Sequence, residues 1–191
     1  AQLTKRWSVE VGTGYATPIV VGNRVFMFAR RGDNEVISAH DADSGKELWR
    51  FGYAAPFEMN SGAAPHGKGP KSTPAYDNGI LLTIGMTGIV TAVDAATGKQ
   101  LWQKPGSAPP PLYTSHAFSP IVDGGAVVFH VGGHERGALT SFDLKTGGVR
   151  WTWEGDGPGY GSPMIARLGG TSQVVTITKQ KVVGLNAATG A

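Results

Sequence analysis

Three residues, His130, His134 and Glu135, come closest in this sequence to a metal-binding motif. On an α-helix, histidines four residues apart share one face and can ligate zinc together. The Val-Gly-Gly between them is poor helix sequence, because glycine loses much backbone freedom in a helix. The segment therefore predicts the end of a strand and a hairpin, and no metal site.

Two further segments resemble ligand-binding loops only in part. Residues 62–68 have the glycine and lysine spacing of a phosphate-binding loop, but Gly69 follows where serine or threonine is required. Residues 41–47 are acidic, yet their glycine is the fifth residue and a calcium loop needs it sixth. We interpret the first as a long connection and the second as a turn. No grouping of Ser, His and Asp has local support, so no catalytic residue is predicted.

The composition narrows the function classes. The chain has 191 residues with 29 Gly and 12 Pro, and 16% of its residues are charged, which suits an ordered protein with many tight turns. The net charge is +3 without a basic run longer than Arg30-Arg31, so no nucleic-acid partner is expected. Cysteine is absent, which excludes disulfides. No apolar run approaches the ~20 residues of a membrane span.

The loops that hold these residues belong to an internal repeat. Four segments align: ISAHDADSGKELW, VTAVDAATGKQLW, LTSFDLKTGGVRW and VVGLNAATGA. The shared positions are Asp41, Asp94, Asp143 and Asn186, then Gly45, Gly98, Gly147 and Gly190, then Trp49, Trp102 and Trp151. Successive copies lie about 40–55 residues apart, which matches a four-stranded propeller blade.

Each copy predicts four antiparallel strands. The first follows a Ser-Pro or Thr-Pro pair, the second is apolar, and the third ends at Asp or Asn, whose side chain can close a turn. The glycine takes a left-handed conformation, and the fourth strand carries a tryptophan that packs and meets a backbone acceptor. We predict one all-β domain over 1–191, a β-propeller with blade repeats at about 17–53, 72–106, 118–155 and 161–191.

The two ends of the repeat pattern suggest how a ring could close. Residues 3–12 read as a lone outer strand with Trp7 at the tryptophan position, and the fourth repeat lacks its last strand. Closure of the ring would remove exposed sheet edges. Three arrangements stay open: half of a ring of seven or eight blades, a ring completed by a second copy or another protein, and a closed four-bladed ring.

In a propeller the connections between blades and the second hairpin of each blade open on one face. The longest connections here are 54–72 and 105–117. We expect this face to dock an anionic ligand or an acidic protein. The candidate residues are Arg31, Asn60, His66, Lys68, Lys71, Tyr113, His116, His134 and Arg136.

The AxDxxTGxxxW pattern, seen at residues 92–102, resembles the tryptophan-docking motif of PQQ-dehydrogenase-like propellers, a group with quinoprotein dehydrogenases and BamB-like proteins. The resemblance covers almost the whole chain and implies a fold, not an activity. The resemblance is compatible with two functions. The favoured one is a non-catalytic scaffold without a cofactor in the bacterial cell envelope, periplasmic or otherwise exported.

The alternative is a PQQ- and calcium-dependent alcohol or sugar dehydrogenase, or a fragment of one. The resemblance implies a quinone in the central channel of such an enzyme, often against a disulfide between adjacent cysteines. This chain has no cysteine, and nothing in the spacing singles out Glu58 or Asp156 as the base.

Overall fold

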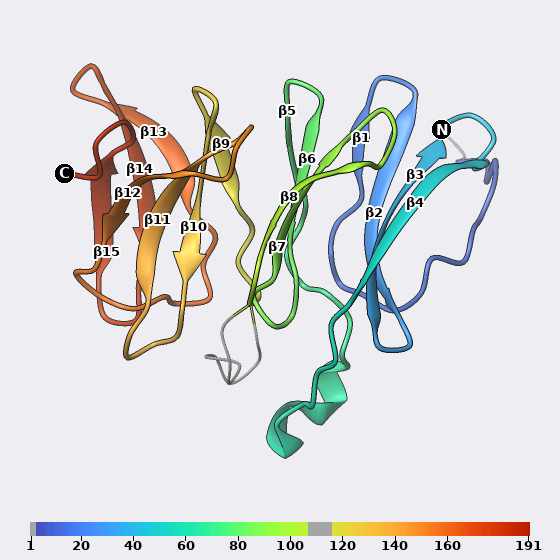
Figure 1. The fold of residues 1–191 in the computed structure, drawn as a ribbon, viewed down its shortest axis with the longest axis horizontal. Coiled ribbons are helices and arrows are strands. Elements are labelled where there is room, and N and C mark those ends of the chain that lie inside the picture. Colours follow the sequence, from blue (N-terminus) through green and yellow to red (C-terminus); the bar gives the residue numbers. More distant parts are fainter. Residues whose placement is uncertain (1–2, 107–115) are drawn as a thin grey trace.

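The computed structural model describes residues 3–106 and 116–191, which form an all-β protein with one short 3-10 helix, η1 (Ser61–His66). Four antiparallel sheets follow one another along the chain and stand side by side (Figure 1). The prediction of an all-β propeller built from antiparallel blades is confirmed. Within the described residues, no helix is long and apolar enough to cross a membrane.

The strands of each sheet are consecutive in the sequence and joined by hairpins. The first sheet contains β1 (Ile19–Val21), β2 (Arg24–Arg31), β3 (Asn34–Asp41) and β4 (Glu47–Ala54). The second contains β5 (Ala75–Asp77), β6 (Ile80–Ile84), β7 (Val90–Asp94) and β8 (Gln100–Lys104). The third contains β9 (Ile121–Asp123), β10 (Ala126–Val131), β11 (Ala138–Asp143) and β12 (Val149–Trp153). The fourth contains β13 (Met164–Leu168), β14 (Thr171–Ile177) and β15 (Val182–Asn186).

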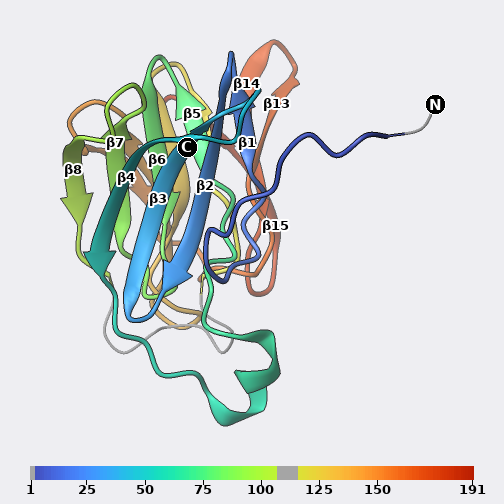
Figure 2. The ribbon, with the colours of Figure 1, turned by 90° about the vertical axis from the view of Figure 1, so that its right-hand side faces the viewer.

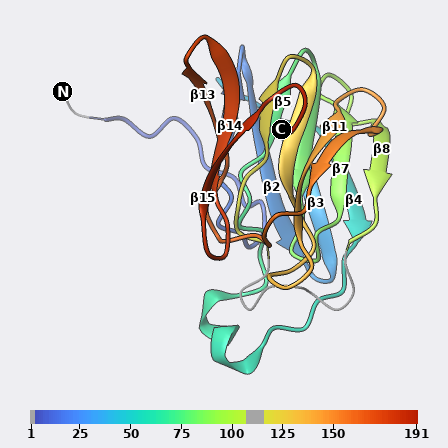
Figure 3. The ribbon, with the colours of Figure 1, turned by 90° about the vertical axis from the view of Figure 1, so that its left-hand side faces the viewer.

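The first strands of neighbouring sheets lie closest together, since β9 contacts both β5 and β13. Viewed along the row of sheets, β13 lies on one side and the last strands β4 and β8 lie on the other (Figures 2 and 3). The sheets are therefore arranged like wedges, with their first strands inward and their last strands outward. This is the arrangement of propeller blades.

The hydrophobic core consists of three clusters, one between each pair of neighbouring sheets. Phe26 and Ile37 of the first sheet pack with Leu81 of the second. The next cluster joins the second and third sheets, and the last joins the third and fourth. In the first three sheets the second and third strands are mostly buried on both faces, which explains their nearly continuous apolar sequence.

The long connections and the second hairpin of every sheet open at the same end of the strands (Figure 1). We call this end the loop face; it comprises residues 32–33, 55–74, 85–89, 132–137, 154–163 and 178–181. The opposite end carries only short turns.

Residues 3–12 depart from the prediction. They form no strand and extend past the first sheet (Figure 2). A strand needs a neighbouring edge for its backbone hydrogen bonds. The edge that lacks an outer strand belongs to the fourth sheet, at the other end of the row (Figure 1).

Candidate functional site

The repeated tryptophans hold neighbouring sheets together. Each indole N–H donates to a backbone carbonyl in the turn of the next sheet. The bonds are Trp7 to Ala42 at 2.8 Å, Trp49 to Ala95 at 3.1 Å, Trp102 to Leu144 at 2.9 Å and Trp151 to Ala187 at 3.0 Å. Trp7 makes this contact although its segment is not a strand. These side chains therefore serve packing, not chemistry.

The turn glycines lie directly under these rings. Gly45, Gly98, Gly147 and Gly190 all have positive φ, between 70° and 75°. A Cβ atom at any of them would lie 2.5–2.8 Å from the nearest atom of the docked indole. Glycine is thus required twice, by the backbone conformation and by the close approach of the ring.

The acidic residues of the same turns are also structural. The Oδ1 atom of Asp143 accepts from the backbone N–H groups of Lys145 and Thr146, and Asn186 makes the equivalent pair of bonds in the fourth sheet. Asp41 and Asp94 accept similarly from Ser44 and Thr97. A hydrogen bond from Arg150, followed by those from Thr146, lowers the pKa of Asp143 to about 2. These carboxylates belong to the turns and are not candidate ligands.

A second set of contacts links the inner strands, and the sequence analysis missed it. The Thr17 N–H donates to Thr73 Oγ1 at 3.3 Å, Thr73 N–H to Ser119 Oγ at 2.9 Å, and Ser119 N–H to Ser162 Oγ at 2.8 Å. All four residues precede a proline in the same place of the repeat. That shared Ser/Thr-Pro pair was the available signal, but it did not show that the hydroxyl accepts a hydrogen bond from the preceding repeat.

The loop face holds most of the predicted ligand residues, but they differ in availability. Asn60, His66, Lys68 and Arg136 are exposed. The Asn60 side chain caps η1 by accepting from Gly62 N–H at 3.0 Å. Tyr113 lies outside the described residues.

Arg31 and Lys71 are partly occupied by contacts within the chain. The Arg31 guanidinium donates to the carbonyls of Val11 and Glu10, at 3.0 and 2.8 Å. The half-buried Lys71 ammonium lies 5.7 Å from the centroid of the Tyr15 ring and contacts Met86 Sδ. Burial lowers the pKa of Lys71. Neither side chain is a free surface cation.

The prediction that His116 belongs to the ligand face is wrong, because only 2% of this residue is exposed. Its ring fits against Gly88, where a Cβ would come within 2.7 Å of it. Phe118 stands edge-on between His116 and His130, with ring centroids 5.4 and 5.3 Å away. The His130 Nε2 atom contacts Thr176 Oγ1 at 3.1 Å, well inside the protein.

The two buried histidines predict loss of stability in mild acid. Burial lowers the pKa of each from 6.5 to about 4. Between these values the unfolded chain binds protons that the folded chain does not, so the free energy of unfolding falls as the pH drops from 6.5 to 4. Two such groups give a slope of up to about 2.7 kcal/mol per pH unit. Urea unfolding at pH 7, 6 and 5 measures it.

The control is the exposed His66. We expect His66→Gln to keep the slope and the double variant His116→Gln/His130→Gln to lose most of it, whatever its stability at pH 7. An equal slope in both variants would show that other groups cause the acid sensitivity.

A buried ion pair anchors the longest connection of the loop face. Arg30 and Glu35 are 4% and 0% exposed, and their charged groups are 3.3 Å apart. The guanidinium also donates to the carbonyls of Ala55 and Lys68, near the two ends of that connection. The Glu35 carboxylate accepts from Tyr53 Oη at 2.9 Å and from the Met86 N–H of the next sheet at 2.7 Å.

Desolvation raises the pKa of Glu35 despite these donors. The carboxylate fills the space beside Gly85, where a Cβ would lie 1.8 Å from Glu35 Oε2. Because all its partners are internal, the pair holds the loop face together and offers no open site.

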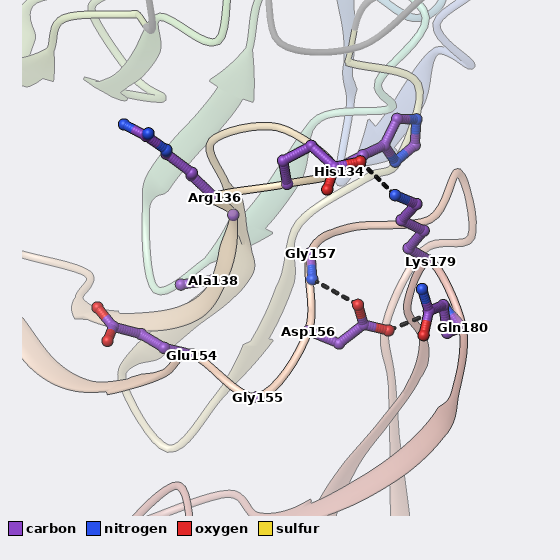
Figure 4. Close-up of a pocket in the computed structure, with 11 residues that line it drawn as sticks. His134, Arg136, Ala138, Glu154, Gly155, Asp156, Gly157, Lys179 and Gln180 are labelled. Atoms are coloured by element: carbon purple, nitrogen blue, oxygen red, sulfur yellow. Dashed lines mark hydrogen bonds and ion pairs between the residues drawn. The ribbon is translucent and has the colours of Figure 1, made fainter.

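A polar cavity on the loop face lies between the third and fourth sheets (Figure 4). It has a volume of about 460 Å³. The β10–β11 hairpin, the connection after β12 and the β14–β15 hairpin form it. Its charged and polar side chains are His134, Glu135, Arg136, Glu154, Asp156, Lys179 and Gln180.

Charges of both signs are interleaved in this polar groove. Lys179 forms an ion pair with Glu135, which lowers the pKa of that carboxyl. Asp156 accepts from Thr178 Oγ1 at 2.6 Å and from the backbone N–H groups of Gly157 and Gln180 (Figure 4). The hydrogen bond from Thr178 is the main cause of its lowered pKa. Arg136 and Glu154 extend toward solvent, so the groove presents a polar surface without a single dominant charge.

The comparisons with known proteins agree with this architecture. A family model described as outer membrane protein assembly factor BamB matches residues 32–191. BamB of Yersinia pestis is 27% identical over 176 residues, which cover 85% of this chain and 41% of that protein. The glycerol dehydrogenase large subunit of Gluconobacter oxydans is 28% identical over 180 residues, covering 81% and 23%.

The crystal structure of BamB from Moraxella catarrhalis gives a TM-score of 0.68 at 22% identity, over 97% of this chain and 52% of that one. The chain thus spans about half, or less, of the length of these relatives. The family match covers β3 and β4 of the first sheet and all strands of the other three sheets. The chain belongs to the BamB-like family of PQQ-repeat β-propellers.

Proposed function

We propose that this chain is a non-catalytic part of a propeller that serves as a protein-binding scaffold in the bacterial cell envelope. The observation that carries the proposal is the polar groove of the loop face, built by hairpins of two rigid neighbouring sheets. Paired and hydrogen-bonded charges of both signs are typical of the rim of a protein interface. The relative named as an outer membrane protein assembly factor supports both the role and the export that it requires.

The proposal includes a neighbour for the fourth sheet. That sheet has three strands, so the outer edge of β15 has no strand beside it within the described residues. Unpaired edges recruit further strands. We propose that another chain, or a further stretch of the same protein, covers this edge and continues the ring.

A PQQ- and calcium-dependent dehydrogenase is the alternative, supported by the similarity to the glycerol dehydrogenase large subunit. The described residues do not fit that cofactor pair. They contain no group of three His, Asp or Glu side chains able to hold a metal ion. Both carboxylate oxygens of Asp156, one of the two bases considered, accept hydrogen bonds from the groove's own backbone and Thr178. The scaffold therefore remains the function that we propose.

Site-specific photo-crosslinking tests the scaffold. A photoreactive residue at Gln180, in the polar groove, is expected to form discrete adducts with proteins of a bacterial envelope fraction. The same residue at Lys145, an exposed position on the opposite face, is the matched control and is expected to form none. Adding Arg136→Glu to the Gln180 probe should reduce the adducts at least about five-fold, as expected when one charge-assisted contact is lost.

Equal labelling from both positions would contradict the proposed surface. A parallel titration with PQQ and Ca²⁺, followed by dye-linked alcohol oxidation, tests the alternative. A saturable quinone complex with turnover would overturn the scaffold in favour of the dehydrogenase.

A further inference from the structure

A second cavity, of about 340 Å³, lies between the second and third sheets. It is distinct from the polar groove and shares no lining residue with it. Ile84, Val90, Phe129, Phe142 and Val149 provide most of its apolar wall. Pockets of this size and character are typical sites for small molecules.

The repeat explains why space remains at this place between the second and third sheets. Two residues after the docked tryptophan, the first and third sheets carry Phe51 and Trp153, and each packs into its cluster between sheets. The second sheet has Lys104 at that position. Four residues after the tryptophan the first sheet has Tyr53, which also packs inward, and the second has Gly106.

The cluster between the second and third sheets consequently receives no aromatic ring from β8 besides Trp102. A lysine and a glycine have replaced the side chains that fill the same space between the first two sheets. The cavity thus lies where the first sheet places aromatic side chains.

The charged residue of the cavity indicates which chemical group a bound aromatic molecule should carry. The Lys104 ammonium lies 5.8 Å from the centroid of the Phe142 ring, on the cavity wall. Among the described residues that line the cavity, none is Asp or Glu. A cation held against an aromatic face without an acidic neighbour in the cavity favours an anionic ligand group.

The inner end of the cavity is polar but neutral. His116 and His130 both line it, and each is at most 2% exposed. The Nδ1 atom of His130 has no hydrogen-bond partner among the described residues. Buried polar atoms are usually paired, so this nitrogen marks a polar patch directly behind the cavity wall.

We propose that this interblade pocket binds a small aromatic carboxylate, with its ring between Phe129, Phe142 and Val90 and its carboxylate on Lys104. The pocket does not depend on the scaffold function, because it uses other residues and lies between other sheets.

Isothermal titration of the full chain with 4-hydroxyphenylacetate tests the pocket. A ligand of about 11 non-hydrogen atoms is expected to bind one site with a dissociation constant on the order of 0.1–1 mM. Lys104→Met should weaken binding about ten-fold, as expected for the loss of one charge-assisted bond. The uncharged analogue 4-methylphenol should bind Lys104→Met and the unchanged protein equally. Lys99→Met, in an exposed turn, is the matched control.

Lys104→Phe provides a readout that does not depend on the ligand. It restores the aromatic residue that the first sheet has at this position, so it should fill the cavity, abolish binding and raise the melting temperature. The absence of saturable binding up to 10 mM, on the order of ten times the weakest expected constant, would overturn the proposal. So would equal affinities of the Lys104→Met and Lys99→Met variants.

Discussion

Replacing Glu35 with alanine is expected to lower the free energy of unfolding by about 3–5 kcal/mol, because it leaves a buried guanidinium without its counter-charge. The change also removes the acceptor of the Met86 N–H and of the Tyr53 hydroxyl. In a chain of this length the loss corresponds to a fall in melting temperature of roughly 6–20 °C. Urea unfolding at pH 7, followed by tryptophan fluorescence, measures the difference.

The matched control is Glu47→Ala. Glu47 pairs with Arg50 on the surface of β4, where their side chains are 35% and 42% exposed. An exposed pair contributes about 0–1 kcal/mol, so this variant should be nearly as stable as the unchanged protein. The double variant Arg30→Met/Glu35→Leu should recover part of the loss, because it removes both buried charges together. Equal effects of Glu35→Ala and Glu47→Ala would show that the buried pair does not anchor the loop face.

Truncating Trp102 to alanine is expected to cost about 3–5 kcal/mol, the usual cost of removing a large aromatic side chain from a packed interface. Its ring packs against the cluster between the second and third sheets, and its N–H bond to the Leu144 carbonyl would be lost. Urea unfolding measures this loss as well. A loss below about 1 kcal/mol would contradict the role of the ring in joining the two sheets.

Gly147→Ala tests the same contact from the other side. The added Cβ would lie 2.8 Å from the Trp102 ring, on a backbone with φ of 70°. Gly124 also has positive φ but nothing within 4 Å, so Gly124→Ala isolates the cost of the conformation. We expect Gly147→Ala to be less stable than Gly124→Ala by about 1–3 kcal/mol. This excess should shrink in a Trp102→Ala background, as measured by a double-mutant cycle.

Much of the fold could be predicted from the sequence because the turn, the glycine and the tryptophan recur in phase. Each of these residue types is favoured by the local backbone conformation, such as a positive φ at Gly98 or an Asx-type turn at Asp94. Such local preferences can be recognised in the sequence without knowledge of the neighbouring sheet. The positions of the loops in each repeat follow from these local preferences. Arg136 and His134 accordingly lie in a hairpin of the loop face.

The parts that could not be predicted depend on contacts between repeats. His116 looked like a surface residue because its burial is due to Gly88 in another loop. Arg30 and Glu35 are five residues apart on facing strands, and their inward direction depends on acceptors at Ala55 and Lys68. The sequence does contain an indication of the pocket beside Lys104, because the equivalent position in the first repeat is the aromatic residue Phe51. This difference indicates a pocket only once the position is known to face the next sheet.

Adjacent repeats contact each other partly through main-chain atoms. Each docked indole donates to a backbone carbonyl, whether the residue that carries it is alanine or leucine, and the hydroxyls of Thr73, Ser119 and Ser162 each accept from an amide. Since the peptide unit is the same in all residues, these hydrogen bonds can form between any two copies, whatever side chains fill the clusters between their sheets. An array of this kind can lengthen by tandem gene duplication, and its members can then diverge independently.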